Sequence, residues 1–200
     1  MRLVIVGTGG FGREVMSYAM ERGAHDLAFA SDSGGEPVFG MPVIRLDDLQ
    51  DDDQAVIAIA SSETRRVVAQ RLRCHVGSLH LGFVGEDVEI DEGAILCPQT
   101  TVTASARIGK HFHANIYSYV AHDCVIGDYV TFAPRVCCNG NVHIGDAAYI
   151  GTGAIIRQGT ADRPLVIGAG ATVGMGAVVT KDVPPGETVV GNPAKPMAKR

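Results

Sequence analysis

Residues 90–126 read IDEGAILCPQTTVTASARIGKHFHANIYSYVAHDCVI, and the spacing of the apolar residues in this segment predicts the fold. Stepping by six from Ile90 lands on an apolar residue twelve times in succession: Ile90, Leu96, Val102, Ile108, Ala114, Val120, Ile126, Phe132, Cys138, Ile144, Ile150 and Ile156. A second row begins four residues later, and all its members except Phe112 are small or β-branched: Ala94, Thr100, Ala106, Phe112, Ser118, Cys124, Val130, Val136, Val142, Ala148, Ala154 and Thr160.

A period of six fits neither an α-helix, with its period of 3.6, nor the two-residue alternation of an ordinary strand. Each unit can supply one short strand and one corner of a triangular coil, so three units make a turn of about 18 residues. Both rows then fill the interior, and glycine tolerates the backbone angles of the corners. We therefore predict a parallel β-helix. Its frame slips once, at Ala161–Val166, and resumes at Ile167, Val173 and Val179.

The first residues carry a different pattern. RLVIV at 2–6 is followed by GTGGFG at 7–12, a helical stretch over 13–23, and LAFAS at 27–31, which ends at Asp32. In a strand–turn–helix unit such glycines allow backbone N–H groups to approach a phosphate at the helix N-terminus. A carboxylate about 20 residues further on contacts the nucleoside in such folds. The predicted phosphate- and nucleoside-binding residues are Gly7, Gly9, Gly10, Phe11, Gly12 and Asp32; the alternative is a purely structural turn.

The same unit continues to about residue 82. We predict a short strand or turn with an acidic helix start over 43–49, and a buried strand over 55–60. A helix over 63–73 capped by Ser61 and a returning strand over 78–82 should follow. Strands alternating with helices predict a small Rossmann-like α/β domain with a parallel sheet. The predicted domains are therefore 1–82, sized for one mononucleotide rather than a dinucleotide, and 83–200, the β-helix with its tail.

Composition narrows the classes of function. The net charge of −5 is spread along the chain, without the basic block expected for nucleic acid or a membrane surface. Neither a signal peptide nor a run of about 18 apolar residues is present, so we expect a cytoplasmic protein. The five cysteines form no CxxC pair and are interpreted as small buried residues, without a metal or disulfide role.

One pair of side chains combines the features of an acid–base site. His122 lies two residues after the interior Val120, so it should point outward, and Asp123 follows it directly. Histidine changes its protonation state near neutral pH and can accept a proton from an attacking amine or hydroxyl. An adjacent carboxylate can orient the ring and stabilise its charged form. The alternative is an ordinary surface pair.

The motif VAHDCVIGDYVTFAP at 120–134 resembles that of hexapeptide-repeat acyltransferases of the sialic acid O-acetyltransferase-like family. Its nearest members N-acetylate nucleotide-linked 4-amino-4,6-dideoxy sugars of the bacillosamine and perosamine type. The similarity extends from the glycine-rich start to VVGNPAKP at 189–196. The resemblance implies a left-handed β-helix, although general priors favour right-handed crossovers. It also implies a homotrimer with active sites between subunits.

The resemblance further implies acetyl-CoA as co-substrate, with His122 as general base, Asp123 assisting it and Asn115 contacting the sugar. Gly140 follows His122 by one full coil, so its N–H could act as an oxyanion donor beside the polar Asn139. The implied contacts for the rest of acetyl-CoA are Gly159, Gly176 and Lys181. The insertion at Ala161–Val166 is expected to cover this ligand.

Two departures from the family affect substrate contacts. Relatives often carry histidine at the places of Thr131 and Phe11. The leading hypothesis is direct N-acetylation of the sugar amine, with no metal and no covalent intermediate. The alternatives are an O-acetyltransferase of a sialic-acid-like sugar and, from another class, a non-catalytic solenoid scaffold.

Overall fold

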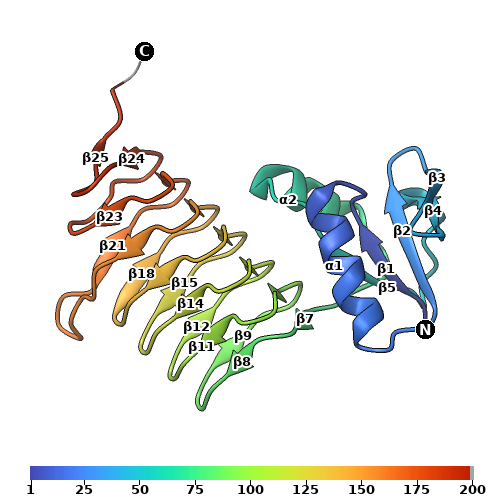
Figure 1. Ribbon diagram of the computed structural model, residues 1–200, viewed down its shortest axis with the longest axis horizontal. Coiled ribbons are helices and arrows are strands. Elements are labelled where there is room, and N and C mark those ends of the chain that lie inside the picture. The colour runs from blue at the N-terminus through green and yellow to red at the C-terminus, as the bar shows by residue number, and fades with distance from the viewer. Residues whose placement is uncertain (199–200) are drawn as a thin grey trace. The chain divides into compact units, whose positions relative to one another are not determined.

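The fold was obtained as a computed structural model that describes residues 1–198 (Figure 1). The chain separates into two compact units, Met1–Ser78 and Leu79–Arg200. Each unit encloses its own apolar core, as expected for two small domains. Within the described residues, no helix has the length and apolar character needed to cross a membrane.

The first unit is built on a six-stranded sheet with strand order β3-β4-β2-β1-β5-β6. Its elements are β1 (Leu3–Val6), α1 (Gly10–Glu21), β2 (Leu27–Ser31), β3 (Gly35–Val38), β4 (Met41–Arg45), the 3-10 helix η1 (Leu46–Asp48), β5 (Gln54–Ile57), α2 (Ser62–Arg71) and β6 (His75–Val76). All neighbours run parallel except β3 and β4. The predicted α/β class is confirmed. Ser61 caps α2 as predicted, its hydroxyl accepting a hydrogen bond from the Thr64 amide.

One prediction for this region was confirmed and one was wrong. The strand and acidic helix start predicted over 43–49 are found as β4 and η1, and β3 adds an antiparallel neighbour to β4. The strand predicted at 78–82 does not return to the α/β sheet, because β7 (Leu79–His80) pairs with β10 (Ile95–Leu96) of the second unit. The structure therefore divides the chain after Ser78, ahead of the predicted boundary at 82. So short a strand carries no periodicity of its own, and pairing alone reveals which sheet it joins.

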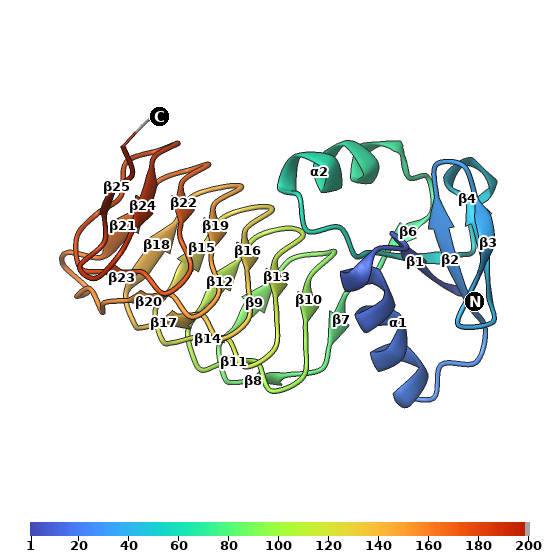
Figure 2. The ribbon, with the colours of Figure 1, turned by 45° about the horizontal axis from the view of Figure 1, so that its top comes forward.

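The second unit is a parallel β-helix with three sheets (Figure 2). The first sheet contains β7, β10, β13 (His113–Ala114), β16 (Thr131–Phe132), β19 (Tyr149–Ile150), β22 (Thr172–Val173), β24 (Thr188–Val190) and β25 (Lys195–Pro196). The second contains β8 (Phe83–Val84), β11 (Thr101–Val102), β14 (Tyr119–Val120), β17 (Cys137–Cys138), β20 (Ile155–Ile156) and β23 (Val178–Val179). The third contains β9 (Glu89–Ile90), β12 (Arg107–Ile108), β15 (Val125–Ile126), β18 (Val142–Ile144) and β21 (Leu165–Ile167).

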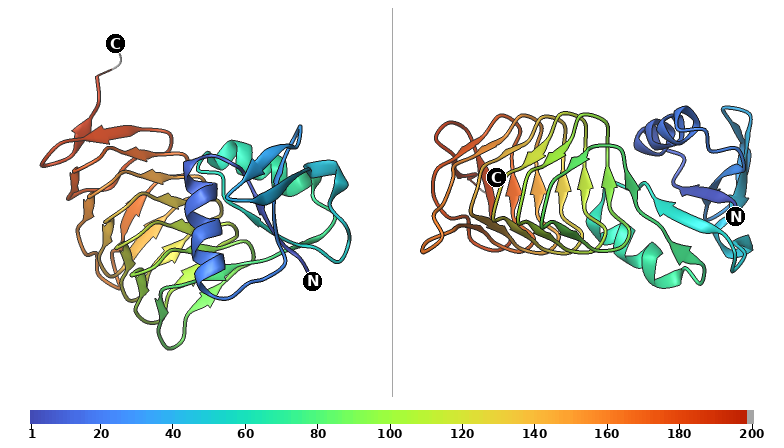
Figure 3. Two further views of the ribbon diagram at one scale, coloured as in Figure 1. Left: turned by 45° about the vertical axis from the view of Figure 1, so that its right-hand side comes forward. Right: turned by 90° about the horizontal axis from the view of Figure 1, so that it is seen from below.

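Stacking follows the predicted period, and the rungs of the ladder are visible in Figure 3. Ile108 is paired with Ile126 and Ile126 with Ile144, so each partner lies three units of the repeat further along the chain. The two apolar rows fill the interior, with Ile90 only partly buried at the N-terminal end. Phe112, the one large member of the second row, is fully buried and packs edge-to-face on Phe132, with ring centroids 5.1 Å apart. Thr160 was wrongly predicted to lie inside, since it is exposed.

The corner between the second and third sheets positions the site. Residues there adopt left-handed backbone angles one coil apart, with φ of +50° at Ser105, +58° at Asp123 and +56° at Asn141. Aspartate and asparagine tolerate this conformation better than most residues. Backbone bonds tie the corner together, because the Asp123 amide donates to Ala104 and the Asn141 amide to His122.

The predicted slip in the frame is an insertion at this same corner. Val142 is paired with Leu165, whereas an uninterrupted frame would bring Thr160 opposite it, so this coil is longer than the others. The amides of Thr160 and Arg163 each donate to the other residue's carbonyl, which closes the inserted segment into a tight turn. Ile167, Val173 and Val179 are then buried again, which confirms the predicted resumption of the frame.

Candidate active site

A single corner of the solenoid brings together His122 and Asp123, the candidate acid–base pair. His122 follows β14, and its Nδ1 lies 2.7 Å from Oδ2 of Asp123. Both side chains are about half exposed, at 47% for His122 and 55% for Asp123, so a substrate can reach them. Cys124, the next residue, is fully buried in the interior row as predicted. The alternation places the acid–base pair outside and the thiol inside.

Gly140 lies against the histidine ring, as the one-coil spacing predicts. A β-carbon placed on Gly140 would lie 2.5 Å from both Cε1 and Nε2 of His122, which no real side chain tolerates. The amides of Asn139 and Asn141 donate to neighbouring coils, whereas the Gly140 amide donates to no acceptor within residues 1–198. Gly140, whose N–H is free of partners within these residues, therefore lies beside the His122 ring.

Two hydrogen bonds that the sequence did not predict fix the side chain of Asn139. Its Nδ2 donates to the Ile156 carbonyl at 2.7 Å, and its Oδ1 accepts from the Tyr119 hydroxyl at 2.9 Å. Because a carbonyl can only accept, these contacts settle which end of the amide is which. Burial raises the pKa of the Tyr119 phenol, which keeps it protonated and able to donate. These two bonds link Asn139 to Tyr119 and Ile156 and so fix the coil next to Gly140.

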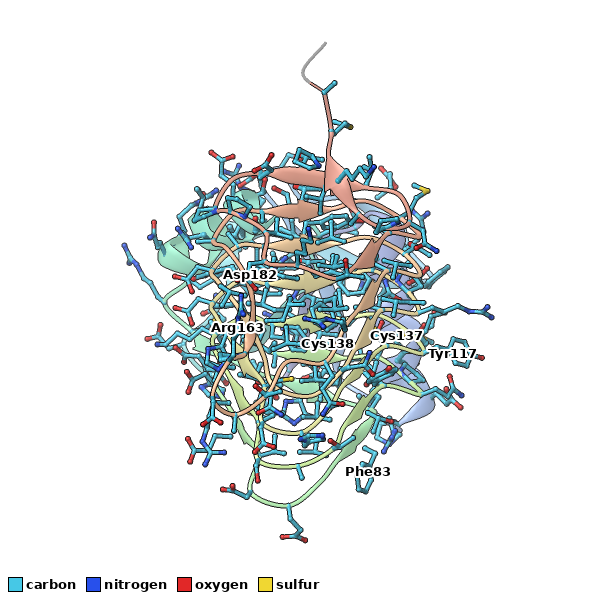
Figure 4. The ribbon with its side chains drawn as sticks, turned by 90° about the vertical axis from the view of Figure 1, so that its left-hand side faces the viewer. Phe83, Tyr117, Cys137, Cys138, Arg163 and Asp182 are labelled. Atoms are coloured by element: carbon cyan, nitrogen blue, oxygen red, sulfur yellow. The ribbon has the colours of Figure 1, made fainter. Side chains whose placement is uncertain are left out.

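Other predicted residues gather on the same corner further up the solenoid. The Gly159 amide donates to the Gly140 carbonyl at 3.0 Å, so the two glycines stack in successive coils. A pocket of about 490 Å³ opens beside them, lined by Arg157, Gln158, Gly159, Thr160, Arg163, Pro164, Leu165, Thr180, Lys181 and Asp182. Figure 4 shows Arg163 and Asp182 on the same flank of the solenoid. The insertion contributes Arg163 and Pro164 to this pocket.

Two predicted residues lie elsewhere. Asn115 follows β13 and therefore occupies the corner between the first and second sheets, at the opposite end of β14 from His122. Gly176 belongs to that other corner as well, with its amide bonded to the Thr152 carbonyl. Within one chain neither residue shares the corner of His122. Thr131, one of the two departures from the motif of the resembled family, is largely buried on β16 of the first sheet.

The predicted phosphate-binding loop lies in the first unit, between β1 and α1. Gly7 has φ of +114°, and a β-carbon on Gly12 would collide with the Gly7 carbonyl, so both positions require glycine. By contrast, β-carbons on Gly9 and Gly10 would meet no atom of the described residues within 4 Å. Among residues 1–198, no side chain caps the start of α1, where Phe11 occupies the first turn. The helix N-terminus is therefore open to an anion.

Asp32 lies at the same edge of the sheet as this loop, because β1 and β2 are parallel neighbours. Its Oδ1 is bonded to Nη1 of Arg71 at 2.6 Å, and Nη2 of Arg71 lies 3.5 Å from Oδ1 of Asp47. The sequence does not predict a role for Arg71, since it is distant from Asp32 along the chain and no local pattern links them. The Arg71 guanidinium thus binds one oxygen of the Asp32 carboxylate, the group that was predicted to contact a nucleoside.

Comparison with known proteins shows the family to which the chain belongs. The PglD N-terminal domain family matches residues 2–72. GDP-perosamine N-acetyltransferase of Escherichia coli O157:H7 is 48% identical over 148 residues, which cover 72% of this chain and 67% of that protein. The chain belongs to the same family of hexapeptide-repeat acetyltransferases.

Two solved structures match almost all of this chain. WeeI from Acinetobacter baumannii AYE is 49% identical, with a TM-score of 0.92 over 98% of this chain and 100% of its own. The acetyltransferase domain of PglB from Neisseria gonorrhoeae FA1090, in complex with acetyl coenzyme A, is 30% identical, with a TM-score of 0.88 over 98% of each chain. The predicted enzyme class is confirmed by this membership.

Proposed function

We propose that the enzyme transfers the acetyl group of acetyl-CoA to the 4-amino group of a nucleotide-linked 4-amino-4,6-dideoxy sugar, with His122 as general base. The observation that carries the proposal is the exposed His122–Asp123 pair with Gly140 against its ring. A GDP-perosamine N-acetyltransferase at 48% identity supports an amino sugar as the acceptor.

The orientation of His122 suits proton removal. An ionised carboxylate only accepts hydrogen bonds, so the contact with Asp123 favours the neutral tautomer of His122 with its proton on Nδ1. Nε2 is then left with its lone pair, on the side that faces Gly140. A sugar amine attacking the thioester carbonyl becomes positively charged, and Nε2 can take its proton as the tetrahedral intermediate forms. The intermediate collapses by breaking the C–S bond, so the amide is released and CoA leaves as a thiolate that takes the proton from Nε2.

Gly140 would stabilise the negative charge that develops on the acyl oxygen. Its N–H has no partner within the described part of the chain and lies next to the base. A fixed backbone donor of this kind is already oriented before the reaction begins, so little reorganisation is needed. Because two stacked coils hold the base and the donor, the solenoid also lowers the entropic part of the barrier.

We assign the pocket beside Gly159 to the remainder of acetyl-CoA. Arg157, Arg163 and Lys181 line it, and cationic side chains suit the phosphates of this ligand. The carboxylate of Asp182 accepts a hydrogen bond from the Val166 amide, which occupies it structurally. A relative of 30% identity was solved with acetyl coenzyme A. We assign the insertion to covering this ligand.

In the first unit, we assign the loop from Gly7 to Gly12 and the start of α1 to the pyrophosphate of the nucleotide. The open space at Gly9 and Gly10 and the uncapped helix support this role. We assign Asp32 to the nucleoside, with Arg71 fixing the carboxylate at one oxygen and leaving the other available.

The acetyltransferase is proposed to act as a homotrimer with sites between subunits. Large apolar side chains lie exposed on the solenoid, including Phe83, which projects from its surface in Figure 4. Asn115 and Gly176 share a corner other than that of His122, so they would complete the site of a neighbouring subunit. Mixing His122→Ala and Asn115→Ala subunits tests this arrangement. Shared sites would restore part of the activity in mixed oligomers, whereas sites within one subunit would not.

The decisive test is a CoA-release assay over GDP-, UDP- and dTDP-linked 4-amino sugars and free sialic acids. We expect turnover with at least one nucleotide amino sugar and a loss on the order of 10²–10⁴-fold in His122→Asn. The matched control is His143→Asn, an exposed histidine of β18, which should retain wild-type rates. Turnover with sialic acids alone would favour O-acetylation instead, and full activity of His122→Asn would exclude the proposed base.

A further inference from the structure

Two buried thiols converge on the carbonyl oxygen of Asn139. The Sγ atom of Cys124 lies 3.2 Å from this oxygen and that of Cys138 lies 3.8 Å from it. Both cysteines are fully buried. Within residues 1–198, no backbone amide donates to the same oxygen. The shorter contact makes Cys124 the principal donor, ahead of its 3.7 Å contact with the His122 carbonyl.

This carbonyl belongs to the peptide group that carries the Gly140 N–H. In a planar trans peptide the C=O and N–H bonds point in opposite directions. The Asn139 carbonyl faces an interior thiol, so the Gly140 N–H must face away from the interior. Gly140 also lies against the His122 ring, which places its free N–H on the reactive side of the coil.

Neighbouring coils show that packing does not require a thiol here. The positions equivalent to Cys124 one coil earlier and one coil later are Ala106 and Val142, and both are fully buried. Neither side chain can donate a hydrogen bond. A donor therefore occurs in the coil that carries His122 and is lacking at the matching places directly below and above it.

We infer that Cys124 is a positioning residue for acetyl transfer. Its S–H holds the Asn139–Gly140 peptide in the orientation that aims the Gly140 N–H at the acyl oxygen. Tyr119 and the Ile156 carbonyl fix the side chain of Asn139 from the other side, so the peptide is constrained at both its carbonyl and its side chain. The inference rests on the proposed function, because it acts through the oxyanion donor assigned there.

The kinetic test compares Cys124→Ala, which removes the donor, with Cys124→Ser, whose hydroxyl can still donate. We expect kcat to fall about tenfold in Cys124→Ala, less than when an oxyanion donor is deleted, because the Gly140 N–H is only misaligned. The KM values of both substrates should stay unchanged, and Cys124→Ser should recover most of kcat. Cys97→Ala provides the control, since it truncates another fully buried thiol of the solenoid.

A second measurement does not depend on turnover. Loss of a hydrogen bond to the Asn139 carbonyl should shift the amide resonance of Gly140 in glycine-labelled enzyme. We expect this shift in Cys124→Ala and not in Cys97→Ala. An unmoved Gly140 resonance, or a Cys124→Ala kcat equal to that of the Cys97→Ala control, would overturn the inference. A wild-type enzyme inactive toward the whole substrate panel would instead count against the proposed function, and the resonance would still decide the role of Cys124.

Discussion

The Nδ1 atom of His122 lies 2.7 Å from Oδ2 of Asp123, although the two residues are neighbours in the chain. The contact is possible because Asp123 adopts a left-handed backbone conformation, with φ of +58°, at the corner of the coil. Left-handed angles recur at Ser105 and Asn141, where no histidine precedes them. The corner is thus a repeated structural feature that one coil uses to orient a base.

Replacing Asp123 by asparagine should separate the two roles of this residue. Asparagine tolerates the left-handed conformation, so the Tm should stay within about 2 °C of wild type. Its amide can donate to Nδ1 and thereby favour the wrong tautomer, so kcat should fall on the order of 10²-fold. Steady-state kinetics and thermal unfolding measure the two effects.

Asp123→Ala serves as the control for the backbone. It removes the carboxylate and also strains the corner, which should cost about 1 kcal/mol of stability in addition to the loss of activity. An Asp123→Asn enzyme with wild-type kcat would show that the carboxylate does not orient the base.

Filling the space at Gly140 should disable the base directly. In Gly140→Ala the added carbon would lie 2.5 Å from Cε1 and Nε2 of His122, so the ring must move away. Since the atoms it meets belong to the end of a half-exposed side chain and not to the backbone, the fold should survive while kcat falls about 100-fold. Gly170→Ala is the matched control, with open space around the new carbon and φ of +66°. It should lose about 1 kcal/mol of stability and keep its activity.

Removing one charge from the pocket beside Gly159 should weaken the binding of acetyl-CoA. Lys181→Ala is expected to raise the KM for acetyl-CoA about tenfold, because one charge-assisted contact is lost. The kcat should stay nearly unchanged. Lys110→Ala is the control, because that lysine pairs with Glu92 at a different corner of the solenoid. An unaltered KM in Lys181→Ala would exclude a contact between this side chain and the co-substrate.

The sequence predicts the solenoid and the register of its site well because both depend on one short period. The repeat alone places Gly140 one coil above His122 and buries Cys124. Asn115 was predicted to join them, but the chain passes from one corner to the next between Asn115 and His122, and the period does not show which corners meet in an oligomer. Likewise, the Arg71–Asp32 pair and the pairing of β7 depend on contacts between distant segments, which no local pattern encodes.

The first unit should show an acid-sensitive stability through Asp53. Its carboxylate is only 3% exposed and receives Nε and Nη2 of Arg2 at 2.9 and 2.8 Å, together with the Gln50 amide. The hydrogen bond with Arg2 lowers the pKa of Asp53 in the folded state, despite the opposing effect of burial. A carboxylate with a lowered pKa stabilises the fold at neutral pH, and this contribution is lost as the pH falls below about 4.

Asp53→Asn should therefore destabilise the first unit by about 1–3 kcal/mol at pH 7, because the Arg2 guanidinium keeps no ionic partner at this position. The difference from wild type should shrink as the pH falls through the range in which the wild-type carboxylate becomes protonated. Urea unfolding at pH 7, 5 and 3 measures it, with Asp52→Asn as the control, since that neighbouring aspartate is exposed. A difference between Asp53→Asn and wild type that stays constant from pH 7 to pH 3 would show that ionisation of Asp53 does not stabilise the sheet.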